Sequence, residues 1–219
     1  MDRSRLEAFS DGVFAVAITL LALNLTVARP GRETLLDQLH WPVFVAYLIS
    51  FFMIGIVWVN HHVLVRGIAV VDRTLLFLNL VLLLFVVMIP WATATVANYL
   101  AAHGPLVHRD TQIATTLYGA VFLALSAGFG GMFEWTLHGE RTYQRLPADK
   151  HWAARARFAG GGLVYVIAIA VAQFYAVASF MIIALVAVYY VVEHTPATGQ
   201  ARDSPGPDSA ADTGPSDGP

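Results

Sequence analysis

Residues 5–27, with the sequence RLEAFSDGVFAVAITLLALNLTV, form the stretch that decides the fold. Its first third is polar and the remainder is apolar. At a rise of about 1.5 Å per residue the stretch makes roughly 34 Å of helix, which is enough to cross the hydrocarbon core of a bilayer. We therefore predict a membrane-spanning helix. A carboxylate inside such a helix is costly unless it is paired, so Asp11 needs a partner.

This predicted helix has two different faces at about 100° per residue. One face carries a stripe of branched apolar side chains, Val16, Leu20 and Leu23, with the hydroxyl of Thr19 at its margin. Asp11 lies on nearly the opposite face. Periodicity alone favours ordinary helix packing or lipid contact for the stripe, and it leaves a more specific role open.

The composition is that of a polytopic membrane protein. Of the 219 residues, 57% are hydrophobic and 13% are charged, which a soluble domain does not show. The absence of cysteine excludes disulfides and thiolate metal sites. The net charge of −2 argues against a nucleic-acid partner. No cofactor is expected.

We predict an all-α fold with six transmembrane helices in one domain, residues 1–194. The apolar segments are approximately Arg5–Val27, Trp41–Val65, Thr74–Leu100, Thr111–Leu137, Ala156–Ala172 and Phe174–Val192. With an even number of spans both termini share a side, and most of the thirteen Lys and Arg residues fall on that side. The positive-inside rule therefore predicts that both termini are cytoplasmic.

The C-terminal residues 195–219 have a different composition. They are rich in Pro, Gly, Ser, Ala and Asp and have almost no large apolar side chains. Such a segment cannot bury a core, so a disordered cytoplasmic tail is predicted.

Polar residues also occur in the second and third segments. Trp58 and His61 lie near the predicted cytoplasmic end of the second, and Asn79 lies inside the third. His61 and His62 are adjacent, so on a helix they point about 100° apart and do not face one metal ion. His61 is the expected partner of Asp11, and a hydrogen bond to a backbone carbonyl is its alternative.

Three motifs occur in order along the chain: Arg5-x3-Phe9-Ser10-Asp11-Gly12 before the apolar helix, Trp58-x2-His61-His62 in the second segment, and Asn79 with Pro90 in the third. Together they resemble the signature of the transmembrane protein 175 family, which are potassium channels of bacteria and of animal endosomes and lysosomes. The resemblance covers about residues 1–194. It implies one six-helix repeat per chain and a homotetramer.

The resemblance also implies the function. The expected protein is a multi-pass potassium channel of the plasma membrane, with potassium ions and the lipid bilayer as partners and a pore lined by the first helix of each subunit. Its hydrophobic constriction would be Val16, Leu20 and Leu23, with Thr19 as a pore hydroxyl. The motif and its supporting polar network would comprise Arg5, Phe9, Ser10, Asp11, Trp58, His61 and Asn79. The Thr-Val-Gly-Tyr-Gly carbonyl filter of ordinary potassium channels is absent from the sequence.

Two other functional classes are alternatives to a channel. The first is a proton-coupled transporter or proton pathway that uses Asp11 and His61, and it requires a water route through the subunit. The second is a membrane enzyme, which is not expected because no paired catalytic residues are predicted to face a common cavity.

Overall fold

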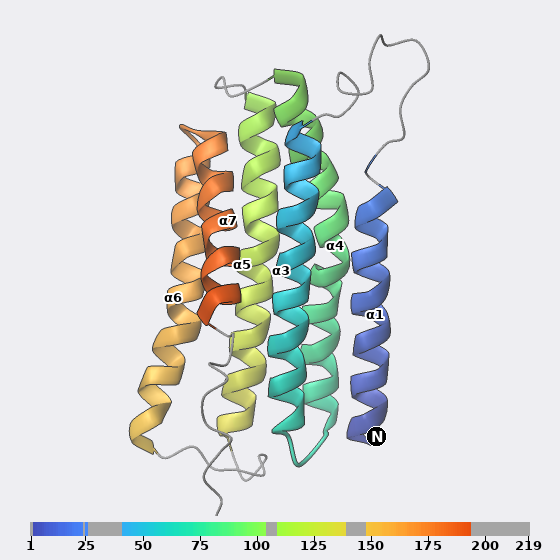
Figure 1. Cartoon of the computed structure of the whole chain (residues 1–219). Helices are drawn as coiled ribbons and strands as arrows, with labels where there is room; N and C mark the ends of the chain where they lie inside the picture. Colours follow the sequence, from blue (N-terminus) through green and yellow to red (C-terminus); the bar gives the residue numbers. More distant parts are fainter. Residues whose placement is uncertain (1, 24, 26–40, 104–108, 139–147, 194–219) are drawn as a thin grey trace, which may run out of the picture.

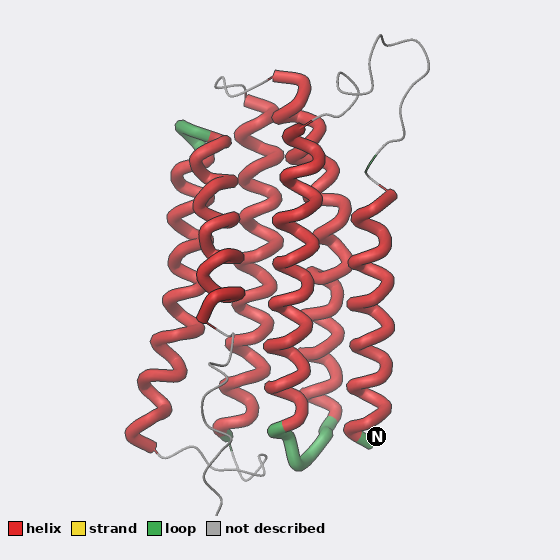
Figure 2. Tube along the Cα trace, in the orientation of Figure 1, coloured by secondary structure: helices red, strands yellow, loops and turns green. Residues whose placement is uncertain are grey.

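The computed structural model describes residues 2–23, 25, 41–103, 109–138 and 148–193. Those residues form six α-helices and no strand. The helices are α1 (Arg3–Leu23), α3 (Trp41–Arg66), α4 (Arg73–His103), α5 (Arg109–Leu137), α6 (Ala148–Ala172) and α7 (Ala176–Glu193). They run side by side as a bundle (Figure 1), with short loops at the bundle ends (Figure 2). Helices suit lipid because their backbone hydrogen bonds are all internal.

Four helices contain stretches that are long and apolar enough to cross a membrane: Arg3–Leu23, Val43–Arg66, Arg73–Ala102 and Arg109–Leu137. The apolar parts of the last two helices are shorter, Ala159–Ala172 and Ala176–Val188. The predicted all-α fold is therefore confirmed, and four of its helices have the length and composition of membrane-spanning helices.

The predicted segment ends agree closely with the helices, with one clear exception. Helix α6 begins at Ala148, eight residues before the predicted start at Ala156. The polar, charged stretch before Ala156 predicts a linker, whereas an alanine-rich helix continues readily beyond the apolar region. Residues 24 and 26–27 of the predicted first segment, and the predicted tail, residues 195–219, lie outside the described residues.

Helix α1 stands at one side of the bundle and packs against α3 and α4 (Figure 1). Helices α6 and α7 stand at the other side, next to α5. The short connection between α3 and α4 makes these two helices antiparallel neighbours. Its last residue, Asp72, caps α4, because Oδ1 accepts a hydrogen bond from the Leu75 backbone N–H at 2.8 Å.

Buried hydroxyl groups join α3, α4 and α5 in the centre of the bundle. The Ser50 Oγ lies 2.8 Å from the Tyr118 Oη and 2.7 Å from the Thr93 Oγ1. Thr93 Oγ1 is also 2.7 Å from the Ile89 carbonyl, to which it can donate its single proton. Tyr118 and Ser50 are fully buried. The chain of hydroxyls therefore ends on a backbone acceptor and leaves no polar group unpaired.

Replacing Tyr118 with phenylalanine is expected to lower the thermal stability of the purified protein. The variant keeps the ring but removes the hydroxyl partner of Ser50, which should cost about 1 kcal/mol. Thermal unfolding in detergent measures this. Tyr175→Phe is the matched control, because Tyr175 is 68% exposed in the turn before α7. Equal melting temperatures for the two variants would contradict a stabilising role for the hydroxyl chain.

Candidate functional site

Helix α1 has a buried side that contacts α3 and α4. Its buried residues recur at helical spacing: Leu6, Ser10, Phe14, Ala17 and Leu21. The other side of α1 is exposed in the single chain, with Val16 at 55%, Leu20 at 37% and Leu23 at 75% exposure. The helix is therefore oriented with Ser10 toward the bundle and with the branched stripe turned away from it.

A buried hydrogen-bonded chain attaches α1 to its two neighbours. Asn79 of α4 donates from Nδ2 to the Ser10 Oγ at 3.1 Å, and Ser10 donates to the Leu6 carbonyl at 2.9 Å. The Asn79 Oδ1 lies 2.7 Å from the Nε2 of His61 on α3. Because an amide oxygen only accepts, His61 carries its proton on Nε2 in this contact. All three side chains are buried.

Asp11 does not pair with His61, so that prediction was wrong. The carboxylate Oδ1 instead accepts a hydrogen bond from the Trp58 Nε1 at 2.8 Å. His61 is engaged by Asn79, and the Phe14 ring lies against it with centroids 5.4 Å apart. Trp58 lies three residues before His61 and has an indole N–H that can only donate, so it suits a carboxylate.

Arg5 and Phe9 were predicted members of this network, but the structure places them on the exposed face of α1. Phe9 is 51% exposed. Arg3, which the sequence pattern did not single out, links α1 to α3 instead. Its Nη1 donates to the Arg66 carbonyl at 3.1 Å, and its Nε lies 3.5 Å from the Glu7 Oε1. The signal for Arg3 was its spacing of four residues from Glu7 on one helix.

The exposed stripe of α1 is apolar apart from Thr19. The Thr19 Oγ1 donates to the Val16 carbonyl at 2.8 Å. Its proton is thereby used within α1, and the lone pairs of the hydroxyl remain on the exposed face. From Val16 to Leu23 the helix rises by about 11 Å. The stripe is thus a band of apolar side chains with one outward-facing oxygen.

This site has no apparent metal-binding or catalytic arrangement. Within the described ranges, no group of three or more His, Cys, Asp or Glu side chains is placed to hold a metal ion. Ser10 and Asp11 of α1 are instead used in contacts with α4 and α3, and the exposed stripe of Val16, Leu20 and Leu23 is apolar. This arrangement fixes one face of α1 against α3 and α4 and leaves the opposite face uncovered by the rest of the chain.

Known proteins resemble this chain in both sequence and fold. A family model described as the endosomal/lysosomal potassium channel TMEM175 matches residues 5–90. A potassium channel of Streptomyces collinus is 37% identical over 209 residues, which cover 93% of this chain and 98% of the relative. The mouse endosomal/lysosomal proton channel TMEM175 is 31% identical over 134 residues, covering 56% of this chain and 27% of that protein.

A solved structure gives the same result for the fold. The crystal structure of a lysosomal potassium-selective channel TMEM175 homolog from Chamaesiphon minutus superposes with a TM-score of 0.73 and 30% sequence identity. The match covers 87% of this chain and 97% of that one. The near-complete coverage of the Streptomyces relative extends the likeness well beyond the region of the family model. The chain therefore belongs to the TMEM175 family, which is a family of ion channels and not of enzymes.

Proposed function

We propose that this protein is a homotetrameric potassium channel whose pore is lined by the exposed face of α1. The observation that carries the proposal is the division of α1 into an anchored face and a free apolar stripe, Val16, Leu20 and Leu23. Bacterial relatives that cover most of this chain bear the name potassium channel, which supports the choice of ion.

Six membrane spans with cytoplasmic termini complete the proposed topology. Helices α6 and α7 have shorter apolar parts than the other four, and they span if the bilayer adapts to them or if their polar ends reach the interface. The excess of Lys and Arg on the side of both termini favours the cytoplasm for that side. In this topology the hydrogen-bonded chain of Ser10 lies in the cytoplasmic half of the membrane.

The constriction would act through size and hydration. Rings of Val16, Leu20 and Leu23 side chains around a central axis offer no ligand to replace the water that an ion sheds. A narrow apolar ring therefore blocks hydrated ions until it widens. Thr19 differs, since its outward lone pairs can contact a cation at the level between the Val16 and Leu23 rings.

Widening the rings should raise ion flux. We expect Leu20→Ala and Leu23→Ala to increase potassium flux per assembled protein in liposomes and to reduce discrimination against sodium. Leu21→Ala is the matched control, because Leu21 is fully buried against the bundle. It should lower stability by about 2–5 kcal/mol without opening the pathway. Opening by Leu21→Ala alone would show that α1 lines the pathway with its other face.

Assembly is tested by cross-linking. The sequence has no cysteine, so a single Leu23→Cys substitution introduces the only thiol. Oxidation should join subunits of the purified protein, because four copies of this exposed stripe would meet at the axis. Leu163→Cys on α6 is a control of similar exposure, 59% against 75% for Leu23, on a helix far from α1. Joining through Leu163 and not through Leu23 would contradict the assembly.

Asp11 is proposed to support α1 rather than to contact ions. Trp58→Phe keeps an aromatic ring but removes the donor to the Asp11 carboxylate, so it should reduce the yield of assembled protein in size-exclusion chromatography. Trp91→Phe is the control, since Trp91 is 54% exposed on α4. If Trp58→Phe assembles normally and only alters selectivity, the carboxylate belongs to the ion pathway instead.

A proton pathway through Asp11 and His61 is the second candidate. The animal relatives named as proton channels favour it. The structure gives the two side chains different partners, Trp58 and Asn79, so a shared proton would have to cross between separate contacts. Liposome flux with potassium, with sodium and with protons alone distinguishes the candidates: proton flux that survives without any potassium flux favours the second.

A further inference from the structure

A groove of about 370 Å³ lies between α5 and α6. Small side chains make its walls, among them Ser126, Ala127, Gly130, Ala159 and Gly162. The two helices approach closely at one level, where a Cβ added to Gly162 would lie 3.6 Å from the Ser126 Oγ. At Gly130, which also lines the groove, an added Cβ would meet no atom within 4 Å. The groove is therefore open space that a slender apolar group can enter.

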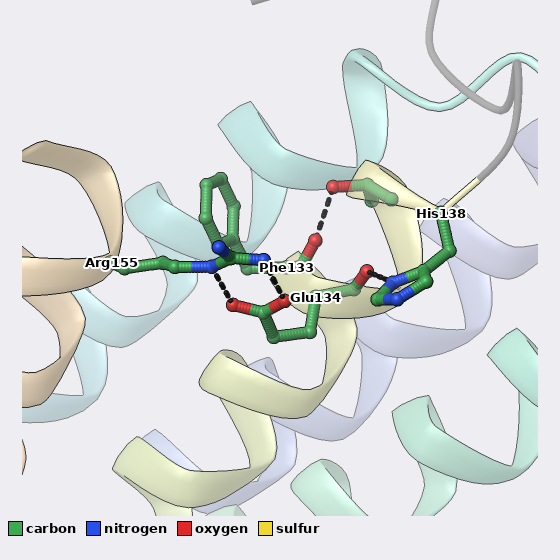
Figure 3. A network of polar contacts seen from close by, with 5 residues as sticks. Phe133, Glu134, His138 and Arg155 are labelled. Carbon is green, nitrogen blue, oxygen red and sulfur yellow. Dashed lines mark hydrogen bonds and ion pairs between the residues drawn. The ribbon is translucent and has the colours of Figure 1, made fainter. Parts of the chain in front are cut away.

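One end of this groove carries a pair of charges. Arg155 of α6 donates from Nε and Nη2 to the two carboxylate oxygens of Glu134 on α5, at 2.6 and 2.8 Å (Figure 3). This uses one edge of the guanidinium and leaves Nη1 for another acceptor. The side chains are 49% and 41% exposed. A half-exposed ion pair contributes little to stability, so packing alone is a weak reason for charges here.

The groove is at the side of the bundle remote from α1 (Figure 1). With α1 at the pore axis, as proposed above, the groove opens toward lipid. Glu134 lies near the C-terminal end of α5 and Arg155 near the N-terminal end of α6. These two helix ends lie at the same end of the bundle as the N-terminus, which is the proposed cytoplasmic end (Figure 1). The sequence between α5 and the apolar part of α6 is also net basic, with Arg141, Arg145, Lys150 and Arg157 besides Arg155, against Glu140 and Asp149.

We propose that this groove binds an anionic phospholipid of the cytoplasmic leaflet. One acyl chain lies along the Gly130 wall, and the lipid phosphate accepts hydrogen bonds from the free edge of Arg155. Basic pockets between transmembrane helices on the cytoplasmic side favour anionic headgroups, and guanidinium is well suited to phosphate. The proposal rests on the proposed assembly only for the direction in which the groove opens.

Native mass spectrometry of the assembled protein tests the groove. The probes are phosphatidylglycerol and phosphatidylcholine with identical acyl chains. Gly130→Leu fills the groove and should weaken phosphatidylglycerol retention about tenfold. Gly160→Leu is the matched control, because Gly160 is exposed on α6 and an added Cβ there also meets nothing within 4 Å. Ala127→Leu, at an exposed groove position, repeats the test if Gly130→Leu does not fold.

The charged end is tested separately. Arg155→Gln should abolish the preference for phosphatidylglycerol over phosphatidylcholine, whereas Glu134→Gln should keep it, because the guanidinium remains. If both variants lose this lipid preference equally, the ion pair serves only to hold α5 and α6 together, and the proposal is overturned. Equal retention of both lipids by the unsubstituted protein, or displacement of lipid by inorganic phosphate alone, would also overturn it. Potassium flux is recorded in parallel. If the protein retains the lipid but conducts no potassium, the proposed channel function is contradicted and the lipid site is not.

Discussion

The hydrogen bonds between α1 and the α3–α4 pair are the interaction on which the rest of the account depends. A carboxylate, an amide, an imidazole and a hydroxyl within apolar helices are each costly when unpaired, and here each has a partner. Two separate contacts, at Ser10 and at Asp11, hold adjacent residues of α1. Rotation of α1 would break both, so the phase of the helix is set by its polar side.

Because one side of α1 is fixed to α3 and α4, its other side can carry branched apolar side chains that the rest of the chain does not cover. In a single chain Val16, Leu20 and Leu23 are exposed, and α1 stands at one side of the bundle where copies of the chain can meet. The network thus holds one side of α1 against its own subunit and leaves the apolar stripe uncovered by the rest of the chain. In the proposed tetramer that stripe faces the symmetry axis. In this account the polar motif is structural, and ion control depends on the width of apolar rings.

The helices were predictable from sequence, because long apolar segments with clear ends specify them. The side of α1 that faces its own subunit follows from its polar residues, since both faces are largely apolar and the polar side chains need partners. The partners were less predictable. Similar depth in the membrane predicts that Asp11 pairs with His61, but Trp58 lies one turn from His61 and is the residue that donates to Asp11. Only the family resemblance places Arg5 and Phe9 in the network, and no spacing argument supports them. The pair of Glu134 with Arg155 depends on how α5 and α6 pack, which spacing does not reveal.

The most direct test of the central claim is whether water-soluble thiol reagents reach the stripe from inside an ion pathway. The chain has no cysteine of its own, so Leu20→Cys and Leu21→Cys each present a single reactive site. Potassium flux in liposomes is measured before and after a charged methanethiosulfonate reagent. The account predicts that modification blocks flux through Leu20→Cys and leaves Leu21→Cys unchanged. Block at Leu21→Cys with no effect at Leu20→Cys would contradict it.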